Sequence, residues 1–180
     1  MIVSISYDYT ESVSQQTLSD NCALIMSYGH FISCDGKTRA VICNAVKNCG
    51  SKTQYDLMLR YKGFDITQEY RLYLTQIDLS TYSHDLQKLI VQPSEVLIEN
   101  APYEWELYKL LPEIYKHDAQ FKNMYALLSN AIKRDRIVSF HGGGFNQYPL
   151  LLQQKNTSSY ANVYKIKRCA IFDRDTNDAV

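Results

Sequence analysis

The chain has no excess of charge of either sign. Its 180 residues include 19 Lys and Arg and 19 Asp and Glu, which gives a net charge of zero. Composition alone therefore gives no electrostatic case for a nucleic-acid partner. No apolar run approaches the roughly 20 residues of a membrane span. The apolar start, Met1–Ile5, lacks basic residues and a long apolar core, so we expect neither a signal peptide nor a membrane segment.

Cysteine is scattered and odd in number, with five residues and no CxxC pair. No Cys/His cluster has the spacing of a zinc site, and the pattern is not that of a disulfide framework. We therefore expect reduced thiols in a cytoplasmic protein. The sequence also lacks internal repeats and low-complexity tracts, and its 46% hydrophobic content is enough for a packed core.

Two aspartates follow an apolar segment near the end of the chain. The segment Cys169–Phe172 is typical of a buried strand, and Asp173 and Asp175 come next. Side chains at i and i+2 of an extended chain project to the same side, so these carboxylates should converge. Paired oxygen ligands at a strand end suit Mg²⁺ or Mn²⁺, which often bridge to phosphate. Asp178 is a candidate third carboxylate.

A second acidic strand end lies far upstream. Val96–Ile98 is a short apolar run, and Glu99 follows it directly. The residues after it, Tyr103–Leu111, carry apolar side chains at helical spacing, which predicts a helix. The sequence thus predicts a strand, an acid at its carboxyl end, and a helix.

A third strand candidate, Arg136–Phe140, runs into a glycine-rich turn. His141, Gly142, Gly143 and Gly144 follow it. Glycines permit a tight turn with positive φ and allow phosphate to approach backbone N–H groups. The turn is not a Walker motif, because no Gly-Lys-Ser/Thr follows. We predict that His141 and the three glycines contact substrate.

The elements alternate along the second half of the chain. A helix is expected over Phe145–Gln154, between the glycine turn and the last strand. Strands alternating with helices favour a parallel sheet with right-handed crossovers. The carboxyl ends of parallel strands form the ligand edge of such sheets. Glu99, the glycine turn and the two aspartates should therefore lie on one edge.

These residues resemble the Toprim domain, a metal-binding fold shared by topoisomerases, bacterial primases and the overcoming-lysogenization-defect (OLD) type nucleases. That family carries a glutamate after its first strand, a glycine after a middle strand and a DxD after a later strand. Here Glu99, the Gly142–Gly144 turn and Asp173/Asp175 match that order. The resemblance implies a Toprim-like (Rossmann-like) parallel sheet with flanking helices over residues 93–180. Family members usually continue past the DxD, so we expect this domain to be truncated at its C-terminal end.

The resemblance also implies an activity. A topoisomerase needs a nucleophilic tyrosine from another domain and a primase needs a zinc module, whereas a nuclease needs only the metal site and water. The implied protein is a Mg²⁺-dependent endonuclease of the OLD type, acting on DNA in preference to RNA. Glu99, Asp173 and Asp175 would be catalytic and, with Asp178, would bind metal. The same resemblance implies anti-phage defence beside a separate ATPase subunit, and it leaves a homo-oligomer open.

Other interpretations remain open at this point. The aspartates could cap a following helix, Asp178 could lie in its first turn, and Glu99 could be an exposed acid without a role. A DxD glycosyltransferase would use the same motif for Mn²⁺ and a diphosphate. A non-catalytic interaction module with a Toprim-like fold is the other alternative, and Asn100, which stands where the family often has glycine, favours it.

Local basic residues fall in two clusters, Lys133–Arg136 and Lys165–Arg168. Both precede strands, so they should sit at the opposite end of the sheet from the acids. Solvated loop charges are the simpler interpretation of each cluster.

The first 92 residues carry no chemical motif. Alternation over Met1–Tyr9 predicts a strand, and Leu24–Ile32 and Thr38–Val46 are predicted to form a hairpin around Asp35-Gly36. Thr67–Leu74 and Ser83–Val91 are predicted helices. These elements predict either a separate α+β module over residues 1–92 or an extension of the sheet, with a boundary near Gln92-Pro93-Ser94.

Overall fold

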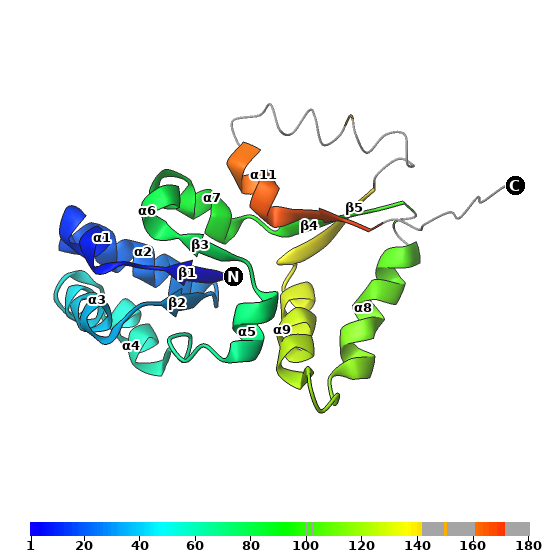
Figure 1. The fold of residues 1–180 in the computed structure, drawn as a ribbon, viewed down its shortest axis with the longest axis horizontal. Coiled ribbons are helices and arrows are strands. Elements are labelled where there is room, and N and C mark those ends of the chain that lie inside the picture. Colours follow the sequence, from blue (N-terminus) through cyan, green and yellow to red (C-terminus); the bar gives the residue numbers. More distant parts are fainter. Residues whose placement is uncertain (100, 102, 142–149, 151–160, 172–180) are drawn as a thin grey trace, which may run out of the picture. The chain divides into compact units, whose positions relative to one another are not determined.

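The computed structural model describes residues 1–99, 101, 103–141, 150 and 161–171. The chain divides into two compact units, Met1–Val91 and Gln92–Val180. Each unit is built around a three-stranded parallel sheet whose strands are joined through helices (Figure 1). The described residues confirm the α/β class of the second half.

The first unit places its earliest strand at the centre of the sheet, in the order β2-β1-β3. Val3 of β1 lies opposite Ile32 of β2 and Ile77 of β3, and all three side chains are buried. The predicted helices at Thr67–Leu74 and Ser83–Val91 are confirmed as α5 and as η1 with α7. The elements are β1 (Ile2–Ser4), α1 (Tyr7–Ser12), α2 (Gln15–Ser27), β2 (Phe31–Ser33), α3 (Gly36–Cys49), α4 (Lys52–Arg60), α5 (Gln68–Tyr73), β3 (Gln76–Asp78), α6 (Leu79–Tyr82), η1 (Ser83–Asp85) and α7 (Leu86–Val91).

The predicted hairpin in this unit is wrong. Leu24–Ile32 spans the end of α2, a turn and part of β2, and Thr38–Val46 lies inside α3. Asp35 is the N-cap of α3, and its carboxylate accepts a hydrogen bond of 2.7 Å from the backbone N–H of Thr38. The Asp-Gly pair therefore begins a helix, as an acidic N-cap does. The buried side chains of α3 recur at helical spacing: Thr38, Ile42, Ala45 and Val46.

The strand predicted over Met1–Tyr9 is also shorter than expected. β1 ends at Ser4, and Ser6 caps α1 by accepting a hydrogen bond of 3.2 Å from the backbone N–H of Tyr9. Because its strands are parallel and alternate with helices, the first unit is α/β and not the α+β module that the sequence predicted.

The second unit repeats this arrangement, with strand order β5-β4-β6. Helices α8 and α9 pack together on one face of the sheet, and α11 lies on the other (Figure 1). A central first strand with helices on both faces is what alternating β and α elements produce when both crossovers are right-handed. The elements are β4 (Ser94–Ile98), α8 (Tyr103–Tyr115), α9 (Lys122–Lys133), β5 (Ile137–His141), α11 (Ala161–Lys167) and β6 (Arg168–Ala170).

The turn before β5 depends on a left-handed residue. Asp135 has φ of 51°, and its N–H and that of Arg136 donate to the carbonyls of Ile132 and Ala131 at the end of α9. These two bonds form a Schellman motif, which satisfies helix-end carbonyls and turns the chain. The turn delivers β5 alongside β4, with Ser94 opposite Ile137.

Among the described residues, no helix combines the length and the apolar character needed to cross a membrane.

Candidate functional site

The carboxyl ends of the three strands of the second unit lie on one edge of the sheet. Ile98 of β4 is the register partner of His141, the last residue of β5. On the other side, Leu97 is the partner of Ala170, which ends β6. The N–H of Ile171 still donates to the carbonyl of Leu97 at 2.9 Å. The chain therefore leaves β4, β5 and β6 at neighbouring points, as the predicted parallel order requires.

Glu99 stands at the centre of this edge. It follows Ile98, which is fully buried, and is itself exposed. The apolar residues of β4 hold the strand in the core. The carboxylate of Glu99 therefore lies where the strand reaches solvent. Carboxylate oxygens are the ligands that Mg²⁺ prefers, so Glu99 fits the role of a metal ligand at this edge.

The remaining predicted site residues lie outside the described residues. These are Asp173, Asp175 and Asp178, together with Gly142, Gly143, Gly144 and the side chain of His141. The helix predicted over 145–154 also falls there, except for position 150. Within the described part of the chain, no three His, Cys, Asp or Glu side chains are grouped to hold a metal ion. The prediction that Asp173 and Asp175 join Glu99 rests on the strand ends, since Asp173 lies two residues after Ile171.

The two basic clusters lie at the opposite, amino edge of the sheet, as predicted. Lys133 ends α9, and its Nζ lies 2.5 Å from Oε1 of Glu113 on α8. The hydrogen bonds from Lys133 and Ser129 hold the pKa of Glu113 at about 2. Arg134 and Lys165 are exposed. Lys133 is thus held by a carboxylate of its own unit at this edge.

A largely buried ion pair joins residues near the starts of two strands. Arg168 begins β6 and lies opposite Glu95, the second residue of β4. Its Nε donates to Oε2 of Glu95 at 2.9 Å, and Nη2 contacts the same oxygen. The side chain of Arg168 is 4% exposed and that of Glu95 is 21% exposed. This pair ties the edge strand β6 to the central strand β4 by a side-chain contact in addition to the backbone ladder.

Lys167, the residue before this arginine, is also buried. Its Nζ donates a hydrogen bond of 3.0 Å to the backbone carbonyl of Gln92. Burial, together with the smaller effect of the positive charge of Arg136, lowers the pKa of Lys167 to about 8. A carbonyl dipole compensates an ammonium less well than a carboxylate does, so the charged form is costly here.

The stability of this unit should therefore depend on pH through Lys167. The folded pKa of about 8 is below the ordinary lysine pKa of 10.5, so between these values the unfolded chain binds more protons. The free energy of unfolding therefore rises with pH between about 8 and 10.5. Below about pH 8 the lysine is charged in both states, and the full cost of burying that charge destabilises the folded unit. The rise should amount to about 3 kcal/mol, and Lys167→Met should abolish it.

Trp105, the single tryptophan, gives the readout, because its fluorescence reports urea unfolding of this unit. Other groups titrate equally in both proteins, so the difference between wild type and Lys167→Met isolates this lysine. Identical pH profiles from 7.5 to 10.5 would contradict the assignment.

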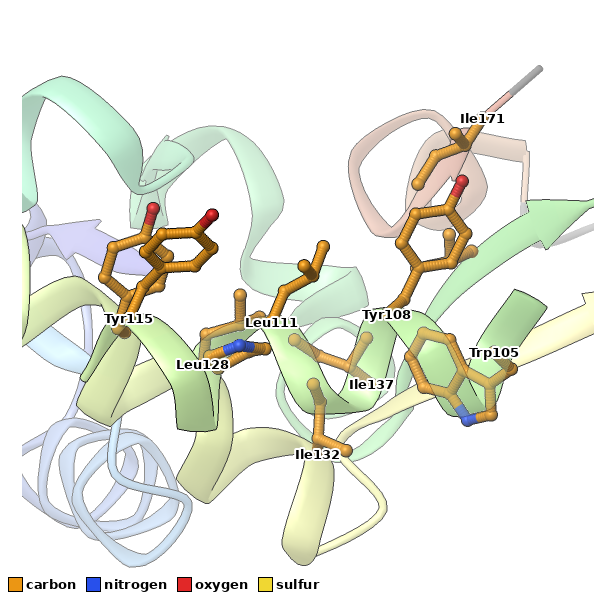
Figure 2. A pocket seen from close by; sticks show the side chains of 11 residues that line it. Trp105, Tyr108, Leu111, Tyr115, Leu128, Ile132, Ile137 and Ile171 are labelled. Carbon is orange, nitrogen blue, oxygen red and sulfur yellow. The ribbon is translucent and has the colours of Figure 1, made fainter. Parts of the chain in front are cut away.

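An apolar pocket lies between α8, α9 and the sheet (Figure 2). Its volume is about 260 Å³, and Trp105, Tyr108 and Ile171 line one part of it. Tyr115 and Tyr125 line another part, with ring centroids 5.6 Å apart in a stacked arrangement. The lining is almost wholly apolar, so the pocket offers few partners to a polar ligand and suits apolar groups.

Sequence reasoning missed both the buried ion pair and the pocket. Glu95 and Arg168 each stand at the start of an apolar strand, so aligning the strand starts would have placed the opposite charges side by side. The pocket left no comparable signal, because the same apolar residues would be expected in a fully packed helix–sheet interface.

Comparison of the chain with protein-family models, curated proteins and solved structures gave no match.

Proposed function

We propose that the second unit is a metal-dependent endonuclease of the Toprim type, acting on DNA in preference to RNA. The supporting observation is the sheet itself. The central strand β4 ends directly before Glu99, and its neighbour β6 ends at Ala170 on the same edge, three residues before Asp173 in the sequence. Carboxylates from two adjacent parallel strands are the arrangement that a phosphodiester-cleaving metal site requires.

Each residue of this edge has a distinct role in the proposal. Asp173 and Asp175 hold Mg²⁺ or Mn²⁺, with Asp178 as a further ligand. When bound, the ion polarises a phosphoryl oxygen and stabilises the charge that develops on the attacking and leaving oxygens. Glu99 accepts a proton from the attacking water or donates one to the leaving 3′-oxygen. His141 and the turn Gly142–Gly144 contact the phosphate backbone of the substrate.

The charge distribution bears on how substrate is recruited. Lys133 and Arg168 pair with carboxylates, and Lys167 donates to a carbonyl, all at the edge opposite Glu99. With a net charge of zero, the chain should bind nucleic acid weakly by itself. This favours a function beside a partner, such as the separate ATPase subunit, which would bring the substrate to the site.

The test is a cleavage assay on supercoiled DNA and on single-stranded RNA. The full chain is incubated with Mg²⁺, Mn²⁺ or EDTA. We expect nicking or linearisation of DNA with either metal and none with EDTA. An intact folded chain that cuts neither substrate with either metal would contradict the proposal for the chain alone.

A non-catalytic interaction module is the second candidate. A specific observation favours it: α8 exposes several large apolar side chains, which is the usual mark of a binding surface. This candidate predicts complex formation without cleavage and no effect of substitutions at Glu99.

A further inference from the structure

Helix α8 carries a continuous row of large apolar side chains on its solvent side. We call Tyr103, Leu107, Leu110 and Ile114 the α8 stripe; their exposed fractions are 82%, 57%, 55% and 64%. The spacing of four, three and four residues places them on one face of the helix. This is the pattern of a coiled-coil seam, in which each side chain packs between residues of a facing helix.

The stripe is additional to the apolar face that α8 turns toward its own sheet. Tyr108, Leu111 and Pro112 line the inner pocket with side chains from the strands. Leu111 and Tyr115 line that pocket and are also 36% and 48% exposed. The helix is therefore apolar on two sides, and only the inner side is explained by the core of the unit.

The stripe is complementary to itself when two copies run antiparallel. A two-fold axis halfway between Leu107 and Leu110 would place each of these leucines opposite the other in the second copy. The same axis places Tyr103 opposite Ile114. All four layers then pair a large apolar residue with another, as isologous dimer contacts require.

Two of the three carboxylates on α8 already have cationic partners. Two carboxylates beside the stripe are neutralised within their own chain. Glu106 lies 2.6 Å from Nζ of Lys109, and Glu113 lies 2.5 Å from Nζ of Lys133. Two copies can therefore meet along the stripe without facing unpaired negative charges from these two positions.

We propose that the α8 stripe is a self-association surface, on which α8 of a second copy packs antiparallel. A specific interface buries roughly 800 Å² on each partner. The α8 stripe is a single row of four side chains on one helix, so we expect a small interface. The dimer should therefore be weak, with a dissociation constant on the order of 1–100 µM.

A charge-swap experiment tests both the surface and the orientation. Sedimentation of the full chain is measured from about 1 to about 200 µM, a range set to bracket the expected constant. Leu107→Lys alone and Leu110→Glu alone should each abolish association. An equimolar mixture of the two variants should restore it, because in the antiparallel pair the introduced lysine faces the introduced glutamate. In a parallel pair the two introduced charges would not meet, and the mixture would stay monomeric.

Leu72→Lys on α5 is the matched control, since Leu72 is also exposed, at 67%. It should leave association unchanged, and circular dichroism should show all variants folded. A wild-type chain that stays monomeric across the range would overturn the proposal and indicate that the stripe meets another part of the chain or a different protein. Dimers that persist in Leu107→Lys would overturn it equally. These outcomes are independent of whether the chain cuts DNA.

Discussion

Replacement of Glu99 by glutamine should lower Mg²⁺-dependent DNA cleavage at least about a hundredfold, the usual contribution of a general acid or base. Glutamine keeps the size of the side chain but can neither accept the proton nor bring a negative charge to the metal. Because Glu99 is exposed and follows a fully buried strand residue, the substitution should leave the fold intact. Single-turnover cleavage of supercoiled DNA at saturating Mg²⁺ measures the effect.

Two comparisons sharpen this experiment. Asp173→Asn should also abolish cleavage at low Mg²⁺, and part of the loss should be recovered at high Mg²⁺ because it removes a ligand. Glu106→Gln is the matched control, since this glutamate is exposed on α8 and pairs only with Lys109 in the ion pairs described. Full activity of Glu99→Gln beside an active wild type would exclude Glu99 from the mechanism and move the site elsewhere on the chain.

The sequence predicts the first two strands and the first helix of the second half well, whereas the strand predicted to be buried over Cys169–Phe172 begins at Arg168 and leaves Cys169 exposed. The run before Glu99 and the segment Arg136–Phe140 are β4 and β5, and the expected helix at Tyr103–Leu111 is the first part of α8. These segments are apolar over a short length or periodic over a long one, so pattern and structure agree. The position of Glu99 directly after β4 followed from the same pattern.

The first half was misread because one local signal has two meanings. Asp35-Gly36 favours a hairpin turn and also favours a helix start, and the side chain alone does not distinguish them. Gly29 is the residue that distinguishes the two interpretations. Its φ of 68° ends α2 in a Schellman motif, in which the N–H of His30 donates to the carbonyl of Ile25. A glycine that ends a helix and an aspartate that begins the next one frame the short strand β2. Read together, these two residues predict helix, strand and helix.

The pair between Glu95 and Arg168 should dominate the stability of the second sheet. Glu95→Leu leaves the guanidinium of Arg168 almost fully buried without this carboxylate, which should cost about 3 kcal/mol of unfolding free energy. Arg168→Met should cost less, because the carboxylate of Glu95 keeps partial access to water. The double variant should return to within about 1 kcal/mol of wild type, since an apolar pair of similar volume avoids the desolvation of both charges.

Urea unfolding followed by Trp105 fluorescence measures the wild type, the two single variants and the double variant, which together form a double-mutant cycle. The exposed pair between Lys109 and Glu106 is the control, and Glu106→Gln should cost less than about 1 kcal/mol because solvent screens both groups. Additive effects of the two single substitutions would mean that Arg168 and Glu95 do not interact. A coupling of about 2 kcal/mol or more would instead show that the ion pair holds the edge strand against β4. Because β6 precedes Asp173 and Asp175 in the sequence, weakening that strand should then reduce cleavage as well as stability. Neither Glu95 nor Arg168 lies at the edge that carries Glu99, so this loss of cleavage would act through the strand.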